Sequence, residues 1–217
     1  NLEIGQNSLH LSDNYIGTCC SSDGLCDTVT VPLNEYKIPT KNYNAYETYK
    51  GRKYLLNFTN IYPRADSFSV ETWIKVALAH DGVILSTGEE NPIEKYWGIS
   101  SNAISKDGSL ISVKLNSGEG EISGFSKKNL LDGKWHHIVF VRDKFVSLVK
   151  FYVDGNLETE FYDLTKDIVD VSSSLQVGVG NPGQEDWFIG NISDISIYNT
   201  ILSEAEINDS YTQNYKE

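Results

Sequence analysis

Alternating hydrophobic and polar residues dominate the chain from about residue 54 onward. In the clearest case, every second residue from Phe68 to Val76 falls on one face, while Glu71, Trp73 and Lys75 fall on the other. A period of two is typical of a β-strand that turns one face to a core. The same reasoning predicts further strands at 82–87, 96–99, 110–116, 135–142, 148–153, 157–161, 174–179 and 188–198.

Turn and cap signals separate these segments. Asp-Gly pairs stand at 107–108, 132–133 and 154–155, and Asp-Gly between alternating segments is a strong hairpin signal. Ser203 and Glu206 have the spacing of a capping box, which predicts a helix from Glu204 to about Tyr211. About ten short strands and one helix predict an all-β sandwich or jelly roll.

Residues 1–45 lack this regularity. Short strand signals occur around 9–11 and 29–31, between stretches that are rich in Asn, Ser and Thr. We therefore expect residues 1–45 to form an irregular N-terminal arm or small appended subdomain, and residues 46–217 to form the sandwich.

Composition and charge exclude several classes of function. Of the 217 residues, 40% are hydrophobic, which is enough for a core, and the formal net charge is −12. Such an acidic chain is a poor ligand for nucleic acid and for anionic membranes. No apolar run is long enough to span a bilayer, so no membrane insertion is expected in this segment.

The three cysteines all lie between residues 19 and 26. Neighbouring cysteines rarely bond to each other, so the expected disulfide joins Cys26 to Cys19 or Cys20. The third thiol is then free or pairs outside the chain. A zinc site with His10 is the weaker alternative, because the spacing lacks a Cys-x2-Cys pair. A local disulfide implies an extracellular or cell-surface location.

Four segments carry a resemblance to a known family. Phe68–Lys75 (FSVETWIK), Asp132–Arg142 (DGKWHHIVFVR), Lys150–Gly155 (KFYVDG) and Phe188–Ile207 occur in the family's order. They resemble the laminin G-like jelly rolls of the concanavalin A-like lectin/glucanase superfamily, over about residues 46–211. The resemblance implies a concanavalin A-like β-sandwich with one short C-terminal helix, which binds glycans or protein partners and is not an enzyme.

Some members of that family carry calcium at the rim of the sandwich. Asp194 matches the family's closing aspartate, but the segment that usually supplies further acids reads Lys50-Gly-Arg-Lys-Tyr54. A calcium ion beside these cations would be repelled, and Arg52 or Lys53 could instead pair with Asp194. We therefore expect no cofactor, with calcium at Asp194 as the alternative.

Two loops combine an aromatic residue with polar side chains, which is the mixture that binds sugars. The candidate ligand-binding residues are Trp97, Trp187, Asn91, Asn181, Gln184 and Asp186. The alternative is that both tryptophans belong to the core or to strand edges.

Catalytic patterns are weak. His136 and His137 adjoin in a predicted strand and therefore point to opposite faces, so they cannot grip one metal or substrate. The glutamate pairs at 119/121 and 158/160 are typical of a solvated face rather than of a glycosidase.

The sequence thus predicts a secreted or surface-displayed module that recognises carbohydrate or an extracellular protein through rim loops. The alternative is a structural subunit of a surface fibre, pilus or adhesin. In that case the N-terminal arm and an intermolecular disulfide from the spare cysteine would make the assembly contact.

Overall fold

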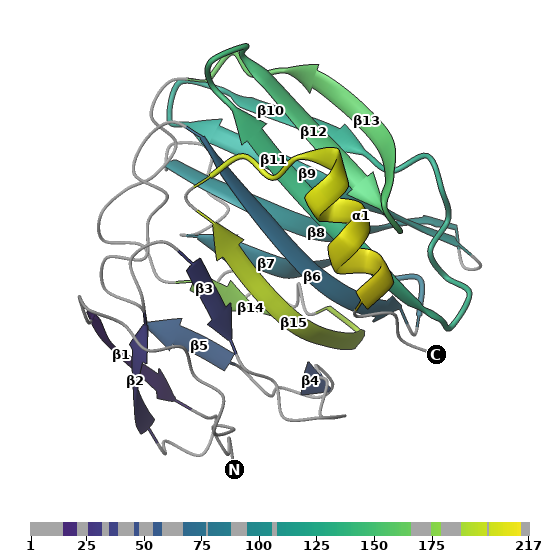
Figure 1. Cartoon of the computed structure of the whole chain (residues 1–217). Coiled ribbons are helices and arrows are strands. Elements are labelled where there is room, and N and C mark those ends of the chain that lie inside the picture. The colour runs from purple at the N-terminus through teal and green to yellow at the C-terminus, as the bar shows by residue number, and fades with distance from the viewer. Residues whose placement is uncertain are drawn as a thin grey trace.

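Two antiparallel β-sheets pack face to face, and one helix lies against the outside of one of them (Figure 1). The computed structural model describes residues 15–20, 26–31, 35–38, 46–47, 54–57, 67–76, 78–87, 95–105, 108–165, 175–178, 188–198 and 200–213, with side chains from residue 67 onward except at 105 and 175–177. The predicted all-β sandwich with one short C-terminal helix is confirmed.

The first sheet contains eight described strands in the order β10-β9-β8-β7-β14-β5-β1-β2. Their bounds are β1 (Tyr15–Cys20), β2 (Cys26–Val31), β5 (Tyr54–Asn57), β7 (Gly82–Thr87), β8 (Lys95–Ser105), β9 (Gly108–Ser117), β10 (Glu121–Phe125) and β14 (Leu175–Val177).

The second sheet contains seven described strands, in the order β13-β12-β11-β6-β15-β3, with β4 also paired to β15. Their bounds are β3 (Glu35–Ile38), β4 (Tyr46–Glu47), β6 (Phe68–Val76), β11 (Trp135–Asp143), β12 (Leu148–Val153), β13 (Asn156–Tyr162) and β15 (Gly190–Tyr198). The strand β6 therefore lies in the middle, hydrogen-bonded to β11 and β15.

The core lies between the sheets and follows the predicted alternation. In β6, Phe68, Val70, Ile74 and Val76 are buried in one cluster with inward-facing residues of the other sheet. Burying a large apolar side chain contributes about 1.5–3 kcal/mol, so this shared interior is the main force that holds the sheets together.

The hydrophobic pattern missed β1, β3, β4 and β5 and, among the strands after residue 67, β10. The inward positions of β10 are Ile122, which is half-buried, and Gly124, which faces the ring of Phe161. A Cβ at Gly124 would collide with that ring, so the position requires glycine and carries no hydrophobic signal. Strand β8 is also longer than predicted, because its second half reads Ser-Ser-Asn-Ala.

The predicted hairpin turn at Asp154-Gly155 and the predicted cap are confirmed, whereas Asp132-Gly133 stands between strands of different sheets and Asp107 lies outside the described residues. Asp154 and Gly155 have φ angles of 52° and 75°, which a two-residue type I′ hairpin turn requires. Helix α1 spans Glu204–Gln213. The backbone N–H of Ser203 donates to Glu206 Oε2 at 2.8 Å, and the N–H of Glu206 donates back to Ser203 Oγ at 3.3 Å. None of the described helices is long and apolar enough to cross a membrane.

Described strands of the first 45 residues join both sheets. β1 pairs with β5 and with β2, and β3 pairs with β15. The strand expected at 29–31 is the end of β2, whereas the one expected at 9–11 lies outside the described residues. The arm thus adds strands to the edges of the sandwich, and the domain boundary at residue 46 stays a prediction.

Candidate functional site

The structure corrects the prediction for Trp97. Its side chain is completely buried, with ring centroids 5.8 Å from Phe68 and 6.1 Å from Phe140. Trp97 has the same parity along β8 as the core residue Ile99, so it points between the sheets. It is therefore a core residue and offers no exposed ring on which a sugar could stack.

The other predicted ligand residues lie outside the described residues. They are Asn91, Asn181, Gln184, Asp186 and Trp187. The first loop joins β7 to β8, and the second runs from Gly178 to Phe188, whose backbone N–H donates to the Gly178 carbonyl at 3.3 Å. Sugar binding by these loops stays a prediction.

Asp194 lies in an irregularity of β15. The pairing of β15 with β6 shifts between Ser193 and Ser196, and Asp194 has a left-handed φ of 50°. Its Oδ2 accepts a hydrogen bond from Ser193 Oγ at 3.1 Å. Within the described part of the chain, no three His, Cys, Asp or Glu residues cluster as metal ligands would. Arg52 and Lys53 fall outside that part, so their pairing with Asp194 stays a prediction.

The outward face of β7–β10 is largely polar, and we call it the polar face. Register assigns residues to it, because those directly opposite one another in neighbouring strands share a face. Its members are Val83, Ser86, Tyr96, Gly98, Ser100, Asn102, Leu110, Ser112, Lys114, Asn116, Glu121, Ser123 and Phe125. Serines and a glycine fill its middle, and Ser86, Ser100 and Ser112 are buried there.

Hydrogen bonds order this face. The Nδ2 of Asn102 donates to Ser112 Oγ at 2.7 Å, and the hydroxyl of Tyr96 donates to Glu121 Oε2. Ser112 and Tyr96 are buried, whereas Glu121 is exposed. The buried residues Ser112 and Tyr96 therefore fix the orientation of Asn102 and Glu121.

Phe125 gives the polar face an aromatic surface at its edge. It lies opposite Ser112 on the edge strand β10 and is 46% exposed. Ser123 and Glu121 precede it on the same face and are also exposed. An accessible ring beside hydroxyl, amide and carboxylate groups is an arrangement that can stack on a sugar and hydrogen-bond its hydroxyls.

The outward face of the second sheet is closed by helix α1. Trp73 stacks on Tyr211 of the helix with centroids 5.9 Å apart, and Ile207 is buried against Val139 and Val141. This face is therefore occupied by the protein itself.

A carboxylate and an imidazole meet beneath that helix. Glu71 accepts hydrogen bonds from Tyr198 at 2.6 Å and Ser210 at 2.9 Å, and its Oε2 lies 3.4 Å from Nε2 of His137. Burial alone would raise the pKa of Glu71, but the hydrogen bonds with His137 and Tyr198 outweigh it and lower the pKa. His137 is only 1% exposed, so the pair serves to dock the helix rather than to reach a substrate.

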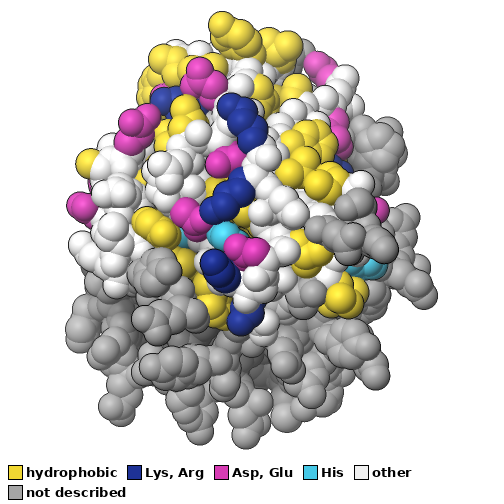
Figure 2. Space-filling model, turned by 90° about the vertical axis from the view of Figure 1, so that its right-hand side faces the viewer, with side chains coloured by type: hydrophobic (Ala, Val, Ile, Leu, Met, Phe, Trp, Pro, Cys, Tyr) yellow, Lys and Arg dark blue, Asp and Glu magenta, His cyan; other side chains and the backbone are white. Residues whose placement is uncertain are grey.

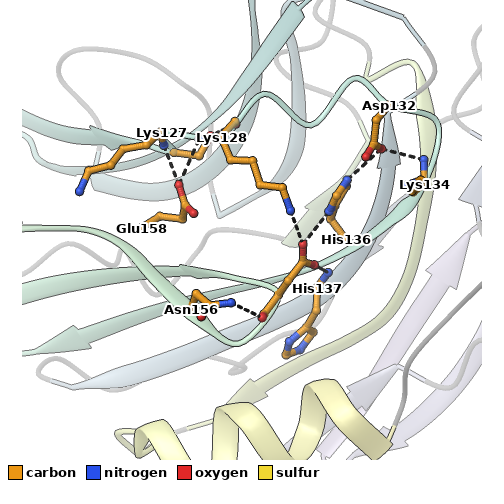
Figure 3. Close-up of polar contacts among 10 residues, drawn as sticks. Lys127, Lys128, Asp132, Lys134, His136, His137, Asn156 and Glu158 are labelled. Carbon is orange, nitrogen blue, oxygen red and sulfur yellow. Dashed lines mark hydrogen bonds and ion pairs between the residues drawn. The ribbon is translucent and has the colours of Figure 1, made fainter.

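Charged side chains form a row along the edge of the sandwich that Figure 2 turns toward the viewer. Among the charged side chains, Asp154 Oδ2 lies 2.8 Å from Lys128 Nζ and 2.9 Å from His136 Nδ1, contacts that Figure 3 draws as dashed lines. The other ring nitrogen of His136 lies 3.0 Å from Asp132 Oδ1. The network ties the turn between β12 and β13 to the segment that precedes β11.

Opposing effects set the pKa values in this network. Burial alone would lower the pKa of His136, but hydrogen bonds to Asp154 and Asp132 outweigh it and raise the pKa. Burial would raise the pKa of Asp154, and the hydrogen bonds from His136 and Lys128 lower it instead. As predicted, His136 and His137 point to opposite faces of β11, since one meets Asp154 and the other Glu71.

Comparison with known proteins decides the family. A model described as the concanavalin A-like lectin/glucanases superfamily matches residues 51–208, which is well over half of the chain. The chain belongs to this superfamily. The match confirms the resemblance that the strand motifs carry.

One relative of this chain is the adhesion G-protein coupled receptor V1 of Danio rerio, which is 21% identical to it over 153 residues. That match covers 68% of this chain but only 2% of the receptor. The chain thus spans a small fraction of its curated relative, and the receptor's activity does not transfer to it.

Several solved structures share the fold of this chain at low sequence identity. The binding domain of botulinum neurotoxin serotype D has a TM-score of 0.63 and 18% identity, over 92% of this chain and 47% of that one. The Ruminococcus gnavus IT-sialidase CBM40 bound to α2,3-sialyllactose has a TM-score of 0.54 and 15% identity, over 69% and 84%. A serotype D ligand-binding domain in complex with N-acetylneuraminic acid has a TM-score of 0.59 and 16% identity, over 93% and 51%.

Proposed function

We propose that this chain is a secreted or surface-displayed carbohydrate-binding module whose polar face contacts the sugar. The observation that carries the proposal is the exposed ring of Phe125 beside the exposed Ser123 and Glu121, at the β10 edge of the polar face. Stacking on one face of a sugar ring supplies apolar contact, while the neighbouring polar groups fix the orientation of the hydroxyls.

The predicted rim loop adds to this site. Residues 88–94 connect β7 to β8 at the end of the polar face where Tyr96 and Glu121 lie. Asn91 is thus proposed to contact the same ligand from the rim. Trp187, Asn181, Gln184 and Asp186 are proposed to form the other rim contact.

The ligands named for similar structures suggest which sugars to test first. One neighbour is bound to sialyllactose and another to N-acetylneuraminic acid. At 15–16% identity these structures share only a fold with this chain, so they guide the choice of glycans and do not assign one.

A protein ligand is the second candidate, and the adhesion receptor relative favours it. In that case the sandwich would be displayed as part of a surface fibre, pilus or adhesin, with the arm making the assembly contact.

A glycan array probed with the full chain tests the proposal, with sialylated and neutral oligosaccharides side by side. We expect concentration-dependent binding to a related group of glycans. Absence of binding to every glycan, together with covalent ladders of the chain on non-reducing gels, would favour the structural subunit instead.

A further inference from the structure

Hydrophobic side chains are exposed at one end of the sandwich, where the β11–β12 turn meets the end of β13. Phe145 is 87% exposed, Val146 57%, Tyr162 73% and Leu164 81%. The two segments lie side by side, because the N–H of Asp163 donates to the Ser147 carbonyl at 2.8 Å. Hydrophobic side chains gather at the corresponding end of the molecule in Figure 2. We call these four residues the apolar tip.

A buried ionic network beneath the apolar tip fixes its two segments to each other. Arg142 Nε donates to Asp163 Oδ2 at 2.7 Å, and both side chains are completely buried. Lys144 Nζ donates to the Thr165 carbonyl at 2.5 Å. A buried ion pair contributes little net stability but can specify a geometry. The tip is therefore held in a fixed shape, so contact with a partner would cost little conformational entropy.

The polar groups of the tip are satisfied within the protein. Asp143 Oδ1 accepts hydrogen bonds from the backbone N–H of Phe145 at 2.9 Å and of Val146 at 3.4 Å. The Lys144 ammonium is turned inward, 3.4 Å from Asp163 Oδ2. In an apolar medium these amides and this cation would therefore keep their partners. Such a transfer is costly mainly for polar groups that lack a partner.

We propose that the apolar tip docks shallowly into the interface of a lipid bilayer with zwitterionic headgroups. The formal net charge of −12 disfavours anionic headgroups. Aromatic and aliphatic side chains gain free energy at the boundary between headgroups and acyl chains, and tyrosine is enriched there. This contact is peripheral and requires no spanning segment, in keeping with the absence of a long apolar run.

The size of the tip argues against a second copy of the chain as its occupant. Four side chains bury roughly a few hundred Å² on each copy, whereas a standard protein interface buries about 800 Å² per partner. The last turn of α1 and the strand β1 lie away from the end that carries the β11–β12 turn (Figure 1). The tip is therefore distal to these elements.

Sedimentation of the full chain with phosphatidylcholine vesicles tests the proposal, with and without added phosphatidylserine. We expect binding to pure phosphatidylcholine that phosphatidylserine does not strengthen. Replacement of one large apolar side chain by serine, in Phe145→Ser or Leu164→Ser, should weaken vesicle binding about ten-fold. Leu78→Ser and Ile104→Ser are matched controls, since each is an exposed hydrophobic residue outside the tip, and should bind as the parent does.

Three results would overturn the proposal. The first is a parent that does not sediment with phosphatidylcholine, the second is equal binding by the tip and control variants, and the third is binding that requires phosphatidylserine and disappears with salt. A dimer that Phe145→Ser dissociates, without vesicle binding, would assign the tip to a second copy. Glycan binding is measured separately on the same variants and should be unchanged, so the two proposals fail independently.

Discussion

The imidazole of His136 in β11 is hydrogen-bonded to the carboxylate of Asp154 in the β12–β13 turn, with 2.9 Å between Nδ1 and Oδ2. Asp154 also accepts a hydrogen bond from the backbone N–H of His137 through its other oxygen, at 3.1 Å. One carboxylate on a hairpin turn therefore fixes both the start of β11 and the imidazole beside it. Because the second ring nitrogen of His136 meets Asp132, the protonated imidazolium suits this position better than the neutral ring.

This arrangement predicts a pH dependence of stability. The folded-state pKa of His136 is raised, so its contribution is fully present below the ordinary value of about 6.5 and is lost as pH rises through the raised value. The pKa values of Asp132 and Asp154 are lowered, so their contributions are lost only in acid. Thermal melting of the parent and of His136→Gln should therefore differ most at about pH 5 and less at about pH 8. A difference that grows with pH would contradict the assignment.

The buried pair of Arg142 and Asp163 predicts a strongly non-additive effect. Arg142→Met leaves the Asp163 carboxylate buried without its main cation, which should cost about 3–5 kcal/mol in the free energy of unfolding. Arg142→Met combined with Asp163→Leu removes both charges and should cost less than the single change. Urea unfolding measures both, and a double variant that is less stable than the single variant would rule out this role.

The register of β1 and β2 sharpens the disulfide prediction. Cys20 lies opposite Cys26, whereas Cys19 lies opposite Asp27. We therefore expect a Cys20–Cys26 disulfide with Cys19 as the remaining thiol. Thiol counting under denaturing, non-reducing conditions should find one free thiol in the parent and none in Cys19→Ser. Three free thiols in the parent would remove the bridge and the argument for an extracellular location that rests on it.

The N-terminal strands should be dispensable for cooperative folding. A chain that lacks residues 1–34 loses β1 and β2, while the described core cluster comes from residues 68–197. We expect a single cooperative thermal transition at a lower temperature, because β5 becomes an edge strand. Loss of the cooperative transition would place the arm within the core and would refute a sandwich that begins at residue 46.

Local signals in the sequence predicted much of the fold. The alternation from Phe68 to Val76, the Asp154-Gly155 turn and the Ser203–Glu206 cap each depend on residues a few positions apart, and each is confirmed. Pairings such as β3 with β15 join residues far apart in the chain, and no local pattern reports them.

The candidate site was less accessible to sequence reasoning for a similar reason. Asn102, Ser112 and Phe125 belong to three different strands, and only the register of β8, β9 and β10 brings them onto one face. Trp97 was misassigned because a polar loop precedes it, although its parity with Ile99 indicates an inward position.

The affinity of the Phe125→Ala variant for the glycan that the array selects tests the central claim most directly. Phe145→Ala is the matched control, since Phe145 is another exposed phenylalanine and lies in the β11–β12 turn, outside the polar face. Burial of a phenylalanine ring against a ligand contributes about 1.5–3 kcal/mol, so calorimetry should find affinity reduced about ten-fold or more in Phe125→Ala. The control should bind as the parent does, and both variants should melt cooperatively. Equal affinity of Phe125→Ala and the parent would contradict binding at the polar face.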